Sequence, residues 1–207
     1  ISILRSRMIA DFTSYAGKNI VGNVNILNTS YANSKGDFNI GTIKLTSKEA
    51  DSSYNAVLNA PFIHAEYNAT APISSFLKKL ASLTLSEHAG AYFAERKEGF
   101  FAPEKMQSLL SRHDEYDFSL ETSNTRSICE LLMPGLYIQD NTALEAHISK
   151  EDILDFKLKS GRLAIKQNYL KGLNLNITNR DSLLNMKMTS DNVLVAGIKM
   201  DSASVAV

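Results

Sequence analysis

The stretch "LDFKLKSGRLAIKQNYLKGLNLNITNRDSLLNMKM", residues 154–188, alternates apolar and polar residues over most of its length. Alternation with a period of two places successive side chains on opposite faces of a β-sheet. Shorter runs of the same kind occur earlier, around residues 24–26, 38–46, 118–121 and 144–148. The pattern predicts a mostly β chain whose strands each have one apolar and one polar face.

Turn-forming residues separate these runs at short intervals. We expect turns at residues 34–37, 160–161, 171–172, 179–181 and 190–192, all of which contain Gly, Asn or Asp. Strands joined by tight turns form an antiparallel meander, and no room is left after residue 140 for the helical crossovers of a parallel sheet. The meander is expected to curl into an open groove, a taco-like sheet.

The middle of the chain has helical periodicity instead. Ile73, Phe76, Leu77 and Leu80 follow Pro72 at helical spacing, which predicts a short amphipathic helix. Similar stripes are formed by Met106, Leu109 and Leu110 behind Pro103, and by Ile128, Leu131 and Leu132 before Pro134. Two or three short helices that cover part of the sheet are therefore expected. A partner-binding or membrane-surface role was the alternative, but their polar faces lack the lysines that membrane surfaces favour.

Three segments follow from these patterns: strands and hairpins in 1–70, a helix-rich insertion with an interleaved strand in 71–135, and a meander in 136–207. The chain starts at Ile1, and its last residues read as a strand. We expect one structural unit taken from a longer protein, with any signal or membrane anchor outside the fragment.

The bulk composition argues against several functions. The 207 residues include 22 basic and 22 acidic side chains, and no basic cluster marks a nucleic-acid surface. The single cysteine, Cys129, cannot form an intrachain disulfide and is expected to be a small buried hydrophobe. No run of residues approaches the length and hydrophobicity of a transmembrane helix.

Catalytic and metal-binding motifs are not found. The four histidines are scattered, and no pair has the spacing of metal ligands. His88 and His113 have carboxylates next to them in sequence, whereas His64 and His147 lie in alternating runs and are expected on the polar face of strands. Nucleophile-elbow and phosphate-loop motifs are also missing. We therefore predict no enzyme activity, no cofactor and no metal site.

Three segments carry a family resemblance. They are "GDFNIGTIKLTS" (36–47), "APFIHAEY" (60–67) and "ISSFLKKL" (73–80). Together with the meander from Leu154 onward, they resemble the TamB family, AsmA-like proteins of the translocation and assembly module. The resemblance rests on the overall pattern of strand, small polar linker and short helix, and it covers most of the chain.

The resemblance implies a function. TamB-like proteins form a long β-groove across the periplasm, anchored in the inner membrane, that carries phospholipid toward the outer membrane and supports outer-membrane biogenesis and protein secretion together with an outer-membrane barrel assembly protein. The alternating residues expected to line such a groove and contact acyl chains are Phe118, Leu120, Phe156, Leu158, Leu173, Leu175, Ile177, Met186, Met188, Val193 and Val195.

A second reading is a closed β-sandwich or barrel that binds carbohydrate or protein at its surface. It predicts exposed aromatic residues at strand ends or loops. The candidates are Tyr15, Tyr31, Tyr54, Tyr67 and Tyr169. The chain has no tryptophan, which makes sugar stacking a weaker expectation.

Overall fold

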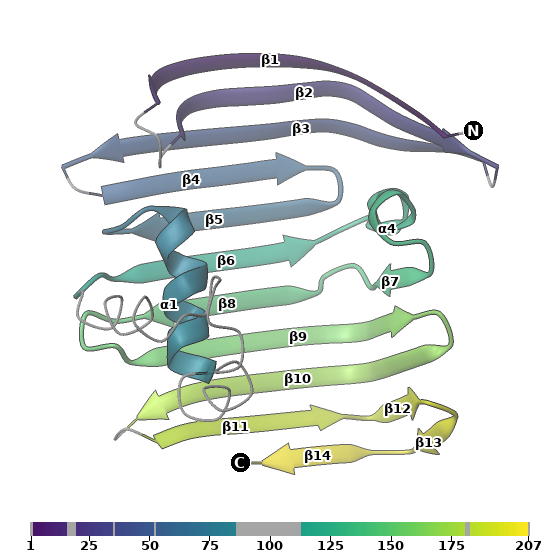
Figure 1. Cartoon of the computed structure of the whole chain (residues 1–207). Coiled ribbons are helices and arrows are strands. Elements are labelled where there is room, and N and C mark those ends of the chain that lie inside the picture. Colours follow the sequence, from purple (N-terminus) through teal and green to yellow (C-terminus); the bar gives the residue numbers. More distant parts are fainter. Residues whose placement is uncertain are drawn as a thin grey trace, which may run out of the picture.

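A computed structural model describes residues 2–15, 20–34, 36–51, 53–85, 113–180 and 183–206. These residues form one antiparallel sheet with fourteen labelled strands, and two short helices (Figure 1). The first five strands are β1 (Ile3–Tyr15), β2 (Ile20–Asn33), β3 (Gly36–Ala50), β4 (Ser53–Ala60) and β5 (Ile63–Ala69). They are followed by α1 (Ile73–Leu85), β6 (Tyr116–Thr122), α4 (Arg126–Leu132), β7 (Leu136–Ile138) and β8 (Ala143–Ile148). The remaining strands are β9 (Leu154–Ile165), β10 (Asn168–Arg180), β11 (Leu183–Ser190), β12 (Asn192–Val195), β13 (Ile198–Met200) and β14 (Ala203–Ala206).

The strands lie side by side in chain order. The main path runs β1-β2-β3-β4-β5-β6-β8-β9-β10-β11-β14, and each neighbouring pair along it is antiparallel. Among the described residues the sheet does not close on itself, so β1 and β14 are its two outer strands. The predicted mostly β, open antiparallel meander is therefore confirmed. Because β5 pairs with β6 and β6 with β8, the ladder also runs without a break through all three segments predicted from the sequence.

Several short strands are pieces of longer ones. β11 and β12 pair with β10 in a single register, in which Thr189 lies opposite Asn174 and Asn192 opposite Lys171. Likewise β13 and β14 pair with β12 and β11 in one register, so they form the next long strand. The predicted turn at 190–192 is therefore wrong, because the strand continues through Asp191, whose N–H donates to the carbonyl of Lys171 at 2.9 Å.

The predicted turns at 160–161 and 171–172 are also wrong. β9 and β10 run through them with Gly161 and Gly172 inside the ladder, and the chain reverses at Lys166, whose φ is +55°. Gly172 has φ +59°, and a Cβ there would lie 2.0 Å from a carboxylate oxygen of Asp191. The glycine is thus needed for close strand approach within the sheet and not for a chain reversal.

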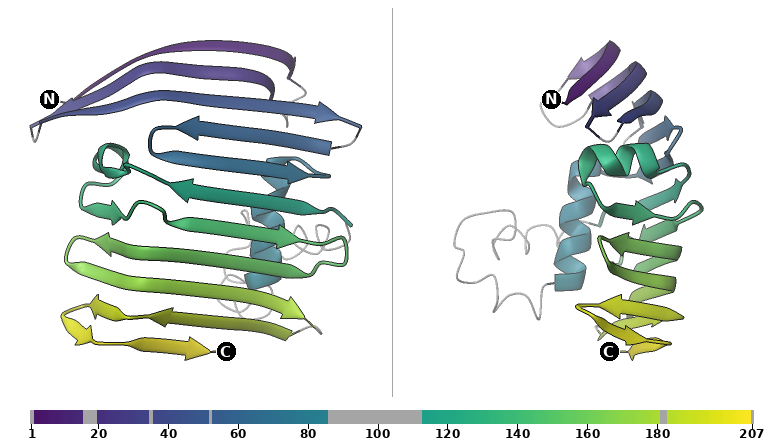
Figure 2. Two further views of the ribbon diagram at one scale, coloured as in Figure 1. Left: turned by 180° about the vertical axis from the view of Figure 1, so that it is seen from behind. Right: turned by 90° about the vertical axis from the view of Figure 1, so that its right-hand side faces the viewer.

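Helix α1 crosses the hollow side of the sheet (Figure 2). Its buried face holds Phe76, Lys79 and Ser82, with Leu80 and Leu83 packed against the core. Ile73 and Leu77, which the sequence placed on the apolar stripe, remain 51% and 60% exposed. Phe76 instead packs against the rings of Tyr67, Tyr116 and Phe118, with centroids 5.3 to 6.2 Å apart.

The main hydrophobic core lies between α1 and the sheet. Tyr116, Ile148 and Leu154 are 1%, 0% and 0% exposed there, and Tyr67 donates a hydrogen bond to the carbonyl of Ala71 at 2.5 Å. The other helix, α4, confirms the prediction for 128–132, and its Cys129 is buried. The expected helix around Met106 lies outside the described residues.

Candidate functional site

One unbroken row of apolar side chains crosses the whole sheet. Cross-strand pairing places one residue of each long strand in this row, and successive pairs follow directly from the register. We call it the central apolar row: Ala10, Val24, Leu45, Leu58, Ala65, Leu120, Leu144, Leu158, Leu175, Met188 and Val205. Most of its members are half-buried, so the row is neither sealed in a core nor fully open to water.

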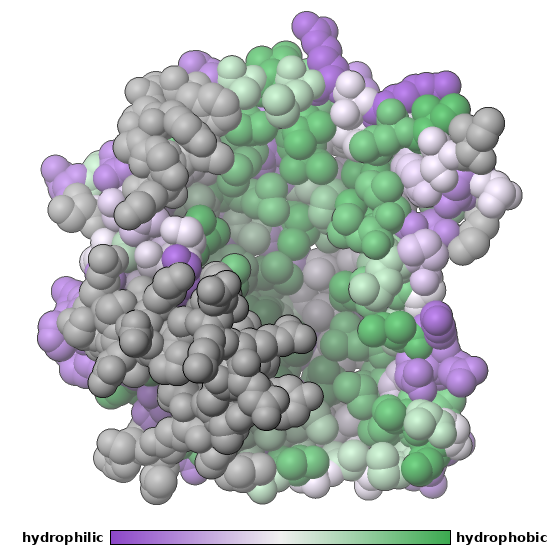
Figure 3. Space-filling model, in the orientation of Figure 1, coloured by the Kyte–Doolittle hydropathy of each residue, from purple (hydrophilic) through white to green (hydrophobic). Residues whose placement is uncertain are grey.

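Parallel rows extend this surface on both sides. Toward α1, Phe118, Phe156, Ile177 and Met186 follow in register. Away from α1, Ile63 and Leu173 lie in a row that also contains Thr122, Ser160 and Ser190. Figure 3 shows the resulting surface as a hydrophobic hollow facing the viewer. We call this hollow the apolar trough.

The opposite face of the same strands is polar. The immediate chain neighbours of the central apolar row form a second cross-strand row on this face. In it Glu66 pairs with Ser119, Ser119 with Glu145, and Glu145 with Lys157. Since neighbouring residues of a strand point to opposite faces, the trough and the polar face are separated by a single residue step. The sheet is therefore strictly two-sided across its central strands.

Nine of the eleven predicted lining residues lie in the trough. Their side chains share one face because they follow the registers of β6, β9, β10 and β11. Val193 and Val195 lie further along, beyond Gly172 and Asp191: Val193 pairs with Leu170 and is 3% exposed, whereas Val195 is 49% exposed. The alternation does not run unbroken from Met188 to Val193, because Gly172 on the neighbouring strand has φ +59° and the Asp191 N–H donates to the carbonyl of Lys171 outside the regular ladder.

The trough has unequal ends. Helix α1 covers the end where Tyr116, Ile148 and Leu154 lie. It is held there by an ion pair in which the Lys79 Nζ lies 2.5 Å from Oδ1 of Asp152, in the turn between β8 and β9. Lys79 is 1% exposed, so this carboxylate pairs with a buried charge.

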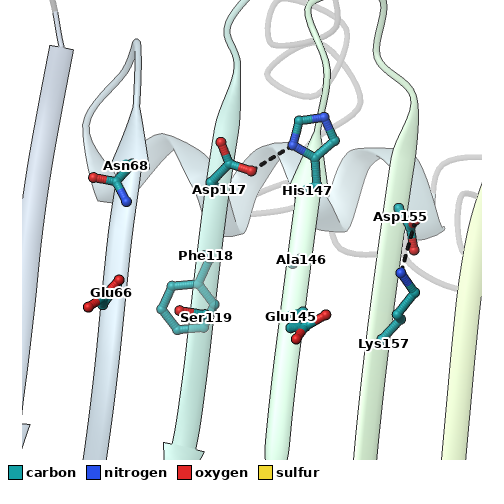
Figure 4. A pocket seen from close by; sticks show the side chains of 10 residues that line it. All are labelled: Glu66, Asn68, Asp117, Phe118, Ser119, Glu145, Ala146, His147, Asp155 and Lys157. Carbon is teal, nitrogen blue, oxygen red and sulfur yellow. Dashed lines mark hydrogen bonds and ion pairs between the residues drawn. The ribbon is translucent and has the colours of Figure 1, made fainter.

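The polar face carries a shallow depression of about 280 Å³. Figure 4 shows its side chains, which come from β5, β6, β8 and β9. His147 Nδ1 lies 2.7 Å from Oδ1 of Asp117, and the Lys157 ammonium lies 3.3 Å from the carboxylate of Asp155. These are exposed surface pairs of the kind that contribute little to stability, and they present no arrangement of nucleophile and base.

The histidines occupy the places that the alternation indicates. His64 is exposed on the polar face between Asn59 and Glu66, at 2.7 and 3.1 Å, and His147 lies on the same face. His113 contacts the carbonyl of Lys150 at 3.0 Å, and His88 lies outside the described residues. Within the described ranges no three side chains of metal-binding type come together.

The tyrosines of the alternative reading are not a set of exposed aromatics. Tyr67 is 3% exposed in the core under α1, and burial raises the pKa of its phenol well above the ordinary value of 10.0. Tyr31 and Tyr54 are half-buried, and the side chain of Tyr15 is not described. Tyr169 is half-buried beside Arg162 and Lys171, whose cationic groups lie 5.2 and 5.4 Å from its ring centroid. The closed sandwich or barrel of that reading differs from the open sheet that the described strands form.

Comparisons with family models, with curated proteins and with solved structures gave no match to this chain. Neither helix in the described part of the chain is long and apolar enough to span a membrane. The class that the fold defines is therefore an open, two-sided antiparallel sheet with an apolar trough partly covered by one helix.

Proposed function

We propose that the apolar trough binds the acyl chains of phospholipid without chemical conversion. The single observation that carries this proposal is the central apolar row, which runs through every long strand and is half-buried along most of its length. Large contiguous apolar patches are rare on free monomers because water contact is unfavourable. An oily ligand that fills the trough removes this surface from water.

The energetics favour a flexible chain ligand. Burial stabilises by about 25 cal/mol per Å² of apolar surface, and each buried methylene contributes about 0.8 kcal/mol. A row of Leu, Val, Met and Ala side chains contacts an acyl chain anywhere along its length, so no residue has to react and no single contact dominates. That property suits conduction as well as binding.

The open meander is also what the resemblance to the TamB family implies. We therefore propose that the chain is a segment of a periplasmic β-groove in a protein anchored to the inner membrane, which moves phospholipid toward the outer membrane and assists outer-membrane protein assembly. Its partners would be phospholipid and an outer-membrane barrel assembly protein. Support for this placement comes from the resemblance together with the open trough.

A photo-crosslinking experiment tests the proposal through neighbouring residues of β9. A benzophenone side chain at position 158 faces the trough, whereas one at Lys157 faces the opposite side. After expression in a bacterial host and mild extraction, we expect phospholipid adducts in the mass spectrum from position 158 and none from position 157. Equal labelling at both positions, or protein adducts in place of lipid at 158, would overturn the proposal.

The same two positions give a matched pair of substitutions. Leu158→Asp introduces a charge into the trough and should lower retained lipid roughly tenfold in native mass spectrometry, because a carboxylate is costly next to acyl chains. Lys157→Asp changes the charge on the other face and should leave lipid retention unchanged. Circular dichroism of both variants checks that the sheet is intact.

A further inference from the structure

Three chain reversals lie side by side at the strand ends away from α1 (Figure 1). They join α4 to β7, β9 to β10, and β12 to β13. The N–H of Lys166 donates to the carbonyl of Gly135 at 2.8 Å, and the N–H of Ala196 donates to Oδ1 of Asn168 at 2.9 Å. These two hydrogen bonds connect the three turns into one continuous edge.

Large aliphatic side chains are exposed along this edge. We call them the apolar rim: Leu132, Met133, Ile165, Val195, Ile198 and Met200, with exposed fractions from 41% to 73%. Strand pairing gathers them, since Ile165 lies opposite Leu136, and Val195 lies opposite Ile198. A contiguous apolar surface that a folded chain leaves in water marks an interaction site.

Positive charge lies directly behind the rim, on the other face of the strands. Gly172, with φ +59°, and the Gln139 side chain, which fills the place of a Cβ on Gly161, interrupt the alternation here. Arg162 and its cross-strand partner Lys171 therefore lie on the face opposite the apolar trough.

Two tyrosine rings accompany these cations. The guanidinium carbon of Arg162 lies 5.5 Å from the ring centroid of Tyr137 and 5.2 Å from that of Tyr169. Lys199 joins the same face, because it pairs with Leu194, the residue opposite Tyr169. Cation–π contacts hold a guanidinium in place while its outer nitrogens stay available.

The edge has basic side chains and no acidic ones. Its three segments, 133–138, 162–171 and 192–200, contain Arg162, Lys166, Lys171 and Lys199 but no Asp or Glu. Across the ranges that the structure describes, none of these four cations forms an ion pair. The nearest acidic residues in the chain lie outside the segments, at Glu130, Asp140, Asp191 and Asp201.

We propose that the apolar rim docks on the surface of an anionic phospholipid bilayer, with its aliphatic side chains in the outer hydrocarbon and the cations among the headgroups. Apolar faces of interfacial elements insert by about 5–10 Å. Arg162 lies three residues behind Ile165 on β9, or about 10 Å at ~3.3 Å per residue. That depth places the guanidinium in the headgroup layer, where tyrosine is also favoured.

A bilayer fits this edge better than a protein partner does. Protein interfaces are depleted in lysine, whereas anionic membranes attract lysine and arginine beside inserted apolar side chains. This inference goes beyond the proposed function, because the contact is made by the strand ends and does not require lipid in the trough.

Vesicle co-sedimentation of the full chain tests the charge requirement. The vesicles contain phosphatidylcholine alone, or phosphatidylcholine with about one-third phosphatidylglycerol. We expect binding about tenfold tighter to the anionic vesicles, as for two or more cations near a charged surface. The double variant Lys171→Gln/Lys199→Gln should remove most of that preference. Lys187→Gln, which removes a charge from β11 away from the edge, should keep it.

A matched pair of substitutions tests the rim. Ile198→Ser should weaken binding to anionic vesicles about tenfold, because a branched aliphatic side chain no longer enters the hydrocarbon. Leu77→Ser removes an apolar side chain of similar exposure, 60% against 66%, from α1 and should leave vesicle binding unchanged. Thermal melts check that both variants are folded.

A fluorescent probe gives a readout that does not depend on affinity. A polarity-sensitive thiol label on Ile198→Cys should shift its emission to the blue when anionic vesicles are added, and the same label on Leu77→Cys should not. The native Cys129 is buried, so labelling under native conditions is directed to the introduced thiol.

The outcomes separate this inference from the proposed function. Leu158→Asp should lose retained lipid and still bind vesicles through the rim. A silent label at position 198, or vesicle binding lost in Leu158→Asp and kept in Ile198→Ser, overturns docking by the rim and leaves the trough proposal standing. Self-association of the chain that Ile198→Ser abolishes would show a protein interface at the rim and also overturn the inference.

Discussion

The two ends of the trough are built from the same strands on the same face, yet only one of them is a core. Under α1, Ile148 and Leu154 are fully buried and Phe76 fits among aromatic rings. Four residues further along β9, Leu158 is only half-buried. The covered end provides protein-only packing that stabilises the sheet, whereas the open end leaves apolar surface for a ligand. Identical alternation thus serves stability or binding depending on what covers it.

The most direct test of this comparison truncates one leucine at each end of β9. Leu154→Ala should reduce the free energy of unfolding by about 3 kcal/mol, because it removes contacts from a filled core and leaves a cavity. Leu158→Ala should cost about 1 kcal/mol without lipid, since much of its surface is already exposed to water. Denaturant unfolding of the delipidated chain measures both, and equal losses would show that the two ends are packed alike.

Removing the charge that anchors α1 should have the next largest effect. Asp152→Asn removes the carboxylate that lies 2.5 Å from the buried Lys79 ammonium, and we expect a loss of about 2 kcal/mol, reduced from the value for a fully buried pair because Asp152 is partly exposed. Lys157→Gln, which breaks the exposed pair with Asp155, is the matched control and should cost less than 0.5 kcal/mol. The same unfolding assay compares them. Similar costs for the two substitutions would mean that Lys79 does not hold α1.

Alkaline pH should weaken the covered end through Tyr67. Burial raises the pKa of this phenol, so the folded state holds its proton more tightly than the unfolded chain does. The associated stability is complete below the ordinary pKa of 10.0 and is lost as the pH rises above it, by at most about 1.4 kcal/mol per pH unit. Unfolding measured between pH 9 and 11 should show this slope for the wild type and a smaller one for Tyr67→Phe. A slope unchanged in that variant would exclude Tyr67 as its source.

The alternation of the sequence predicted the mostly β meander and the face of nine lining residues, because burial on one side imposes a strict period of two. It misplaced a turn at 190–192 because a local Ser-Asp-Asn motif reads as a chain reversal, although pairing with β10 continues on both sides of it. The glycines at 161 and 172 were misread for the same reason. Whether a glycine reverses the chain or lets two strands approach depends on its partner strand, which the local sequence does not contain.

The anchoring of α1 was not predictable from local patterns. Lys79 looks like an ordinary solvated lysine until the β8–β9 turn places Asp152 beside it.

The two outer strands of the described sheet, β1 and β14, determine how the sheet could be lengthened. Since every strand contacts mainly its neighbours in the chain, an additional hairpin joined in register at β1 or β14 repeats the same cross-section without disturbing the rest. Each such hairpin extends the hydrophobic path by about 10 Å, twice the ~4.8 Å spacing between strands. The length of a groove of this design therefore increases linearly with the number of hairpins, whereas its width depends on the number of residues in each strand.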